Sequence, residues 1–184
     1  MIDLGTGSGC IPLLLAHLLP PGSLDAQAVD ISLPAIQLAR DNAILCGIPP
    51  APRSSHHNTF SPIQASFLNS AFTDDRKLTP PYDILTSNPP YIPWNEYFQL
   101  PGEVAHYEDP KALLGGPSGL DFYRAIARLI QDKNFLLPGG LVALEVGHGQ
   151  ARSVENILRA SGRSCRTEIW CDPWGKERTV LVRF

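Results

Sequence analysis

The chain of 184 residues has a formal net charge of -3, a pI near 5.9 and 43% hydrophobic residues. This length and hydrophobic content suffice for one domain with a buried core and are short for two. The acidic balance excludes a global basic field, so composition disfavours autonomous binding to a nucleic-acid backbone and favours a protein as any large partner.

No apolar run has the length of a membrane span, since the longest, IPLLLAHLL, contains about half the residues required. The four cysteines are scattered without a C-x-x-C pair, which indicates reduced thiols instead of a disulfide framework or a zinc site. His56 and His57 lack a ligand partner at helical spacing and are interpreted as loop residues. We expect no metal, no membrane partner and a monomer.

The first fifty residues alternate apolar runs with helical periodicity, which indicates an α/β domain with a mainly parallel sheet. MIDL predicts a first strand, residues 5–9 a glycine turn, the next residues a helix to about Leu19, and AQAVD a second strand. Ser32 is predicted to cap the following helix, which ends at Gly47. Its predicted buried face consists of Ala35, Leu38, Ala39, Asn42, Leu45 and Cys46.

The middle of the chain is less regular. Residues 48–61 are rich in Pro, Ser, His and Asn and are interpreted as a surface insertion before a short strand near PIQAS. YDILTSN predicts a buried strand, and a long irregular stretch follows it to about Gly119. Irregular segments of that length often cover a site.

The last third returns to regular periodicity. Tyr123, Ile126, Ala127 and Ile130 mark an amphipathic helix, GGLVALEVG predicts a buried strand, and residues 150–161 another helix. CRTEIWCD and ERTVLVRF predict two strands joined through PWGK, as an antiparallel pair at the sheet edge.

The segment DLGTGSG places three glycines between a strand and a helix. Such a loop lets the backbone approach a ligand closely and directs free helix N–H groups at it. Asp30 follows about twenty residues later at a strand end, where a carboxylate accepts hydrogen bonds from ribose hydroxyls. Asp3 would repel a pyrophosphate but attract the cationic methionine end of S-adenosylmethionine, directly or through water. The pattern therefore favours the methyl donor over a dinucleotide.

A second segment, TSNPPYIP, combines an amide, two imino-acid rings and an aromatic face. Asn88 offers a carboxamide, whereas Pro89 and Pro90 keep their carbonyl acceptors and have no N–H donors. Tyr91 adds a flat stacking surface. At the end of a strand this arrangement presents acceptors to an incoming –NH2 group, so we interpret it as a nitrogen-binding site.

DLGTGSG followed by NPPY resembles the class I S-adenosylmethionine-dependent methyltransferases that act on planar amide or amino nitrogens. YEDPKALLGGPSGLDFYR, LEVGHGQ and DPWGKER further resemble the HemK-type protein glutamine methyltransferases, over almost the whole chain apart from residues 48–61. The resemblance implies a Rossmann-like, mainly parallel seven-stranded sheet with helices on both faces and an antiparallel edge strand. It also implies transfer to the glutamine in the Gly-Gly-Gln loop of class 1 release factors.

Site residues follow from the resemblance by matching positions. The implied cofactor-binding residues are Asp3, Gly5, Thr6, Gly7, Ser8, Gly9, Asp30, Ile31, Phe67 and Asn88. The implied substrate-amide site consists of Asn88, Pro89, Pro90 and Tyr91. One position departs from the family, because Ser66 stands where an acidic residue usually precedes the Phe67 position.

The family also carries an N-terminal helical domain that docks the substrate. Residues 1–184 correspond to the methyltransferase domain alone, and MIDLG offers little strand before its glycine turn. We therefore expect that the helical domain and the start of the first strand are missing from this chain.

Two alternatives stay open at this point. NPPY is shared with nucleic-acid amino-group methyltransferases, which need a basic groove and a base-flipping pocket. The other alternative is an inactive, truncated fragment that binds the cofactor. The expected compartment is the mitochondrial matrix for a eukaryotic source and the cytoplasm for a bacterial one. The tryptophans at 94, 170 and 174 are interpreted as packing residues, with substrate contact as an alternative for Trp94.

Overall fold

The computed structural model describes residues 1–48, 56–100, 102–103, 108–163 and 165–184. By its internal contacts the chain forms two compact units, Met1–Ser87 and Asn88–Phe184. The boundary between them in the sequence falls directly after strand β4 (Tyr82–Ser87).

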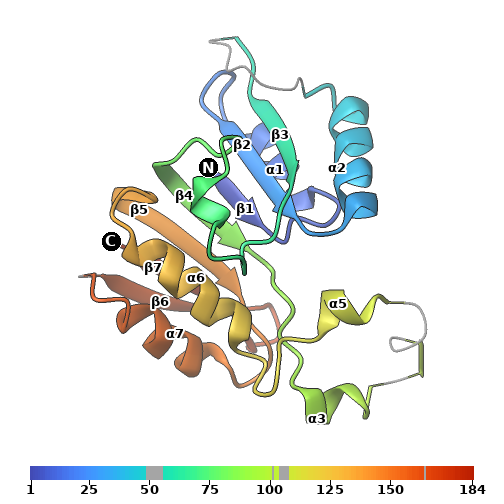
Figure 1. Ribbon diagram of the computed structural model, residues 1–184, viewed down its shortest axis with the longest axis vertical. Helices are drawn as coiled ribbons and strands as arrows, with labels where there is room; N and C mark the ends of the chain where they lie inside the picture. Colours follow the sequence, from blue (N-terminus) through green and yellow to red (C-terminus); the bar gives the residue numbers. More distant parts are fainter. Residues whose placement is uncertain (49–55, 101, 104–107, 164) are drawn as a thin grey trace. The chain divides into compact units, whose positions relative to one another are not determined.

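Parallel strands form the framework of the first unit, in the order β3-β2-β1-β4. The other three strands are β1 (Ile2–Leu4), β2 (Asp25–Asp30) and β3 (Thr59–Gln64). Leu4 is in register with both Val29 and Ser87, so the carboxyl ends of these strands lie at one edge. Figure 1 shows α1 (Cys10–Leu18) and α2 (Leu33–Leu45) beside these strands, in blue. A short 3-10 turn, η1, covers Phe72–Asp74.

One core cluster of the first unit consists of small and aliphatic side chains around one aromatic ring, Phe60. Alanines occupy much of the surface between helices and strands, which allows their backbones to approach closely. The cluster contains Met1, Leu13, Ala16, Leu24, Ala26, Ala28, Ala39, Ala43 and Phe60.

Helix α2 begins as predicted, because the Ser32 side chain caps it by accepting from Ala35 N. Its predicted buried face is wrong except at Ala39. The buried residues are Ile36, Ala39 and Ala43, whereas Leu38 and Leu45 are 50% and 83% exposed. The two alanines on this face let the helix lie close to β2 and β3, with Ile36 as the one larger side chain buried between them.

Strand β3 starts earlier than the sequence indicated. Thr59 and Phe60, which the prediction assigned to the surface insertion, are buried residues of the strand. The Asn58 side chain is also buried, donating to the carbonyls of Ala16 and Leu19. The prediction for residues 48–61 is therefore wrong at its carboxyl end, and residues 49–55 lie outside the described part of the chain.

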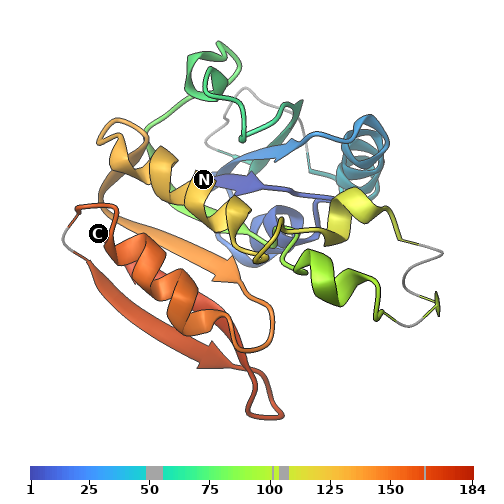
Figure 2. The same cartoon turned by 60° about the horizontal axis from the view of Figure 1, so that its bottom comes forward.

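The second unit contains an antiparallel sheet in the order β5-β7-β6. Its strands are β5 (Leu136–Glu145), β6 (Arg166–Cys171) and β7 (Glu177–Arg183). Helices α6 (Asp121–Gln131) and α7 (Ala151–Arg159) pack on each other, and Figure 2 shows them side by side next to these strands. The predicted antiparallel pair β6–β7 is confirmed.

The stretch between β4 and α6 is less irregular than predicted, because it contains the short helices α3 (Trp94–Tyr97) and α5 (Pro110–Leu113). The Asp109 side chain caps α5 by accepting from Lys111 N. Residues 101 and 104–107 of this stretch, including the tyrosine that opens YEDPKALLGG, lie outside the described residues. The predicted face of α6 is confirmed, since Tyr123, Ile126, Ala127 and Ile130 are buried.

Seven strands, parallel in the first unit and antiparallel at the edge in the second, confirm the predicted sheet. Among the described helices, none combines the length and apolarity that crossing a membrane requires.

Candidate functional site

The glycine loop, residues 5–9, follows β1 at the carboxyl edge of the parallel strands. The loop is tied to the neighbouring strand because Gly5 N and Thr6 N both donate to the Val29 carbonyl, at 2.8 and 2.9 Å. On its other side, the Asn42 amide of α2 donates to the Ser8 carbonyl at 2.9 Å. The loop is therefore held in place before any ligand binds.

The glycines of this loop differ in what surrounds them. Gly7 has φ +55° and nothing within 4 Å of the position that a Cβ would take. Gly9 has φ +78°, and a Cβ there would lie 3.1 Å from the Phe60 ring and 3.3 Å from Ala39. A side chain at Gly9 would thus press on Phe60 and Ala39, so packing requires glycine there. At Gly7 the space that a side chain would occupy is empty.

Asp30, at the carboxyl end of β2, is a partner of the loop. Its carboxylate accepts from Gly7 N at 2.9 Å and from Ser32 N at 2.8 Å. An ionised carboxylate has about four acceptor sites, so roughly two remain for a ligand such as a ribose diol. Asp30 therefore orients the loop and also offers the acceptors that the sequence predicted.

Beneath the loop lies a buried carboxyl group with an unsatisfied oxygen. Asp3 is 1% exposed, and its Oδ1 accepts from the Thr86 hydroxyl at 2.6 Å. The Thr6 hydroxyl lies beside Asp3, yet in the described part of the chain it and Asp3 Oδ2 are two of three buried side-chain polar atoms without a well-formed hydrogen bond. Buried polar atoms are normally paired, so this pair of oxygens fits a donor group supplied by a ligand.

Burial raises the pKa of the Asp3 carboxyl from 3.8 to about 6, although the neighbouring hydroxyls of Thr6 and Thr86 lower it. The negative charge of Asp30 raises the pKa further. A cation next to Asp3 would reverse this shift, because it favours the ionised form. The site is therefore suited to an ammonium group.

The two predicted adenine contacts differ in exposure. Ile31 is 61% exposed directly after β2, as expected of an apolar surface that is available to a flat base. Phe67, after β3, is 8% exposed and belongs to the interior of the first unit. Ser66, at the position that departs from the family, accepts from Asn69 N through its carbonyl.

The Asn-Pro-Pro-Tyr segment, residues 88–91, opens the second unit. Asn88 is exposed, Pro89 is buried, and Pro90 and Tyr91 are partly buried. Within the described residues, no hydrogen bond involves the Asn88 side chain, so its amide is available to a ligand. Asn88 follows Ser87 of β4, whose hydroxyl donates to the Leu4 carbonyl at 2.6 Å.

Residues distant in sequence hold the carboxyl end of this segment. Ile92 N donates to the Leu113 carbonyl, and Gly115 N donates to the Ile92 carbonyl, both at 2.9 Å. The Gln150 amide donates to the Tyr91 carbonyl at 2.8 Å. The ALLGG and GHGQ segments thus have a local physical role, because both contact Tyr91 or its neighbour.

Burial raises the pKa of Tyr91, and the nearby charge of Glu145 raises it further while Arg178 lowers it. Glu145, at the end of β5, also has a raised pKa because of burial. The Tyr91 hydroxyl therefore stays protonated at neutral pH, which suits a packing or donor role better than that of a base.

The prediction that the three tryptophans are packing residues is wrong. Trp94, Trp170 and Trp174 are 54%, 57% and 83% exposed. Trp94 lines an apolar hollow of ≈ 270 Å³ together with Tyr97, Phe98 and Leu114. Periodicity around a lone tryptophan does not indicate which of its faces is covered, so the sequence carried no signal for this exposure.

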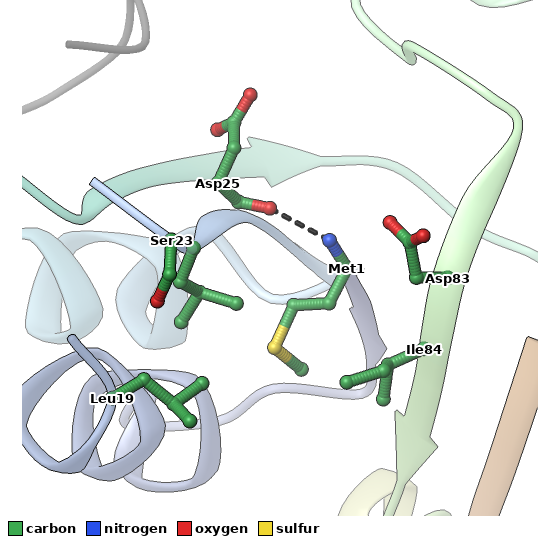
Figure 3. Close-up of a pocket in the computed structure, with 7 residues that line it drawn as sticks. Met1, Leu19, Ser23, Asp25, Asp83 and Ile84 are labelled. Carbon is green, nitrogen blue, oxygen red and sulfur yellow. Dashed lines mark hydrogen bonds between the residues drawn. The ribbon is translucent and has the colours of Figure 1, made fainter. Parts of the chain in front are cut away.

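A second hollow, of ≈ 350 Å³, lies in the first unit (Figure 3). Met1, Asp25 and Asp83 among its lining residues belong to the amino ends of strands, and the Met1 amino group donates to the Asp25 carbonyl at 2.7 Å. Ligands of open parallel sheets bind outside the carboxyl ends of the strands. This hollow lies at the opposite edge from the glycine loop and is not the candidate site.

The chain has sequence relatives that match it over nearly its whole length. The chain is 38% identical over 184 residues, its full length, to the release factor glutamine methyltransferase of Rhodospirillum rubrum, of which it covers 50%. It is 40% identical over 181 residues, 98% of the chain, to the protein of the same name from Bradyrhizobium diazoefficiens, of which it covers 54%. This chain is similar over its whole length to release factor glutamine methyltransferases. These relatives confirm the resemblance drawn from the motifs.

The chain spans about half the length of the curated relatives that it matches. No family model matches it. Among solved structures, a methyltransferase from Pyrococcus furiosus is similar with a TM-score of 0.61 and 14% identity, covering 99% of this chain and 73% of that one. At this identity the likeness concerns the fold alone, and it confirms the predicted Rossmann-like fold.

Sequence reasoning missed two residues that shape the site. Asn42 was assigned to the buried face of α2, but its amide supports the glycine loop. Gln150 was placed at the start of a helix without a role, but its amide holds Tyr91. A polar residue in an otherwise apolar pattern was the available signal for Asn42, and for Gln150 it was its place at the end of LEVGHGQ.

Proposed function

We propose that this chain transfers a methyl group from S-adenosylmethionine to the side-chain amide nitrogen of the glutamine in the Gly-Gly-Gln loop of class 1 translation release factors. The observation that carries the proposal is the exposed, unpartnered carboxamide of Asn88, which heads a segment anchored at Tyr91 and Ile92. The name of the relatives supports the release factor as substrate.

The glycine-loop residues fit the proposed cofactor. Asp3 Oδ2 and the Thr6 hydroxyl would receive the ammonium group of the methionine end, and the open space at Gly7 admits the chain that carries it. The remaining acceptor sites of Asp30 would hold the ribose hydroxyls, with Ile31 against the adenine. When bound, the cofactor supplies an electrophilic methyl group on a sulfonium.

The residues of the Asn-Pro-Pro-Tyr segment would prepare the nucleophile. An amide nitrogen is a poor nucleophile because its lone pair is delocalised into the carbonyl. Asn88 Oδ1 and the Pro89 carbonyl would accept from the two N–H groups of the glutamine amide, and Tyr91 would pack on its plane. Acceptors held outside that plane favour pyramidal nitrogen, and a proton leaves to water once the new N–C bond has formed. Rate would arise mainly from positioning.

The experiment compares methyl transfer from labelled S-adenosylmethionine to a class 1 release factor, to DNA and to RNA. The proposal predicts label in the protein alone. Label in nucleic acid alone would contradict it and favour amino-group methylation of bases. Calorimetric titration with the cofactor separates the third possibility, because an inactive fragment would bind cofactor and label none of the three substrates.

We further infer that the compartment is that of the release factor served, either the bacterial cytoplasm or the mitochondrial matrix.

A further inference from the structure

We propose that Gln150 is a positioning residue for methyl transfer, acting through Tyr91 to fix the Asn-Pro-Pro-Tyr segment in its reactive conformation. The inference rests on the proposed function and adds a residue to which no role had been assigned. Gln150 lies 59 positions from Tyr91 in the sequence and directly precedes α7.

Both ends of the Gln150 amide are used within the second unit. Its Nε2 donates to the Tyr91 carbonyl at 2.8 Å, and its Oε1 accepts from Gly147 N at 3.1 Å. Gly147 follows β5, so the amide connects the end of that strand with Tyr91. A carboxamide offers a donor and an acceptor at once, whereas an ionised carboxylate only accepts and an aliphatic side chain does neither.

Two glycines leave space for this amide and for the tyrosine. A Cβ at Gly119 would lie 2.2 Å from the Tyr91 carbonyl oxygen and 2.5 Å from Gln150 Nε2. A Cβ at Gly147 would lie 2.7 Å from Gln150 Oε1 and 2.9 Å from Tyr91 Cδ2. Any side chain at either glycine would displace the Tyr91–Gln150 contact, which is therefore built into the backbone around it.

A third glycine, Gly115, packs directly against the backbone of Pro90 and Tyr91. A Cβ there would lie 2.7 Å from the Pro90 carbonyl oxygen and 2.8 Å from Tyr91 Cα. We name Gly115, Gly119, Gly147 and Gln150 the Tyr91 clamp. Gln150 is the only member of the clamp with a side chain, and that side chain donates the hydrogen bond to the Tyr91 carbonyl. It can be replaced without the steric clash that a substitution at one of the three glycines would cause.

Asn88 and Tyr91 are close in the sequence, so the position of Tyr91 affects the position of Asn88. Asn88 is three residues before Tyr91 and separated from it by two prolines, whose φ angles are fixed near -65°. A shift of the Tyr91 carbonyl is therefore transmitted to Asn88 with few torsions to absorb it. Displacement of a reacting group by about 1 Å costs up to a hundredfold in rate.

The test uses the full chain with Gln150→Leu, Gln150→Glu and the matched control Gln37→Leu, an exposed glutamine on α2 that bonds to Asp41. Single-turnover methyl transfer to the release factor should fall about ten- to hundredfold in Gln150→Leu. Cofactor affinity should stay at the wild-type value, and Gln37→Leu should match wild type throughout.

Gln150→Glu provides a readout that a merely structural role would not change. An ionised glutamate accepts from Gly147 N but cannot donate to the Tyr91 carbonyl, whereas a protonated glutamate can. Transfer by this variant should therefore recover relative to wild type as the pH falls toward the glutamate pKa. A constant ratio of the two rates over pH, or an unchanged rate in Gln150→Leu, would overturn the inference.

Amide hydrogen exchange tests the clamp without any substrate. In Gln150→Leu, the Ile92 and Gly115 amides should exchange at least about tenfold faster than in wild type, while the amides of β1 and β2 keep their rates. Unchanged exchange at Ile92 and Gly115 would contradict the inference. If these amides exchange faster in Gln150→Leu but the wild-type chain transfers no methyl group, the Tyr91 clamp is supported and the proposed function is contradicted.

Discussion

The glycine loop and the Asn-Pro-Pro-Tyr segment present their proposed ligand-binding groups in opposite ways. The loop keeps two of these atoms buried and unsatisfied, Asp3 Oδ2 and the Thr6 hydroxyl. The Asn-Pro-Pro-Tyr segment has a firmly bonded carboxyl end at Tyr91 and Ile92 and an exposed, unpartnered Asn88. The first arrangement suits charge recognition and the second suits orientation of a neutral amide. Changes in the loop should therefore affect binding, and changes in the segment should affect rate.

The largest effect is expected from Asn88→Ala. The loss of a positioned acceptor should reduce single-turnover methyl transfer by at least about a hundredfold, whereas cofactor affinity falls much less. Asn88→Asp keeps an acceptor of similar size and should retain partial activity. Equal losses in rate and in cofactor affinity would show that Asn88 acts mainly on the cofactor. The predicted difference between the segment, which affects rate, and the glycine loop, which affects binding, would then be wrong.

Asp30→Ala should weaken cofactor binding by about 1.5 to 3 kcal/mol, because it removes charge-assisted hydrogen bonds to the ribose. It also releases Gly7 N, which the carboxylate holds at 2.9 Å. Calorimetric titration with S-adenosylmethionine gives the measurement, and Asp41→Ala on the exposed face of α2 is the control. An affinity like that of the control would reject the assignment of Asp30.

The raised pKa of Asp3 predicts a pH dependence of cofactor binding. An ammonium ligand favours the ionised carboxylate, so affinity should decline below pH 6, by up to about tenfold per pH unit. Asp3→Asn should bind weakly and show no such decline. A wild-type affinity that stays constant between pH 5 and 7 would contradict the charge recognition assigned to the loop.

The same group makes a prediction for stability. Because the folded state raises the Asp3 pKa from 3.8 to about 6, the protonated form is favoured in the folded chain. The stabilisation of the folded chain by protonated Asp3 is fully present below pH 3.8 and is lost as the pH rises through 6. Asp3→Asn should therefore raise the free energy of unfolding at pH 7, by about 1 to 3 kcal/mol. Denaturant titration at pH 7 measures this difference, and a lower free energy of unfolding for Asp3→Asn than for wild type would contradict the prediction.

The smallest effects are expected from a pair of glycine substitutions within the loop. Gly9→Ala should lower the free energy of unfolding by about 2 kcal/mol, because its methyl group meets Phe60 and Ala39. Gly7→Ala should cost about 1 kcal/mol, since it introduces strain at φ +55° without a clash, and should weaken cofactor binding. Similar stabilities for the two variants would mean that Gly9 is not held by packing.

The contrast between the two regions also explains what the sequence predicted. The glycine loop, β1, β2 and Asp30 were predictable, because their key contacts lie between adjacent elements and follow a contiguous motif. The edge pair β6–β7 was predictable from apolar runs around a turn. The face of α2 and the start of β3 were not, because small alanines and a threonine carry weak patterns that packing overrides.

The clamp lies beyond sequence reasoning for a different reason. Gln150 meets Tyr91 only after α7, β5 and the turn near Gly115 are in place, and no local pattern specifies which way an amide points. The exposure of Trp94 and Trp174 likewise depends on which elements cover them. The candidate catalytic residues were thus predictable as a motif, and the groups that hold them were not.

The most direct test of the central claim is to locate the transferred methyl group by tandem mass spectrometry. Wild-type chain is incubated with S-adenosylmethionine and a class 1 release factor, with a Gln→Ala release factor in its Gly-Gly-Gln loop as control. The account predicts one added methyl group on the side-chain amide nitrogen of that glutamine and none on the control. A methyl group at any other residue, or equal methylation of the Gln→Ala factor, would contradict it.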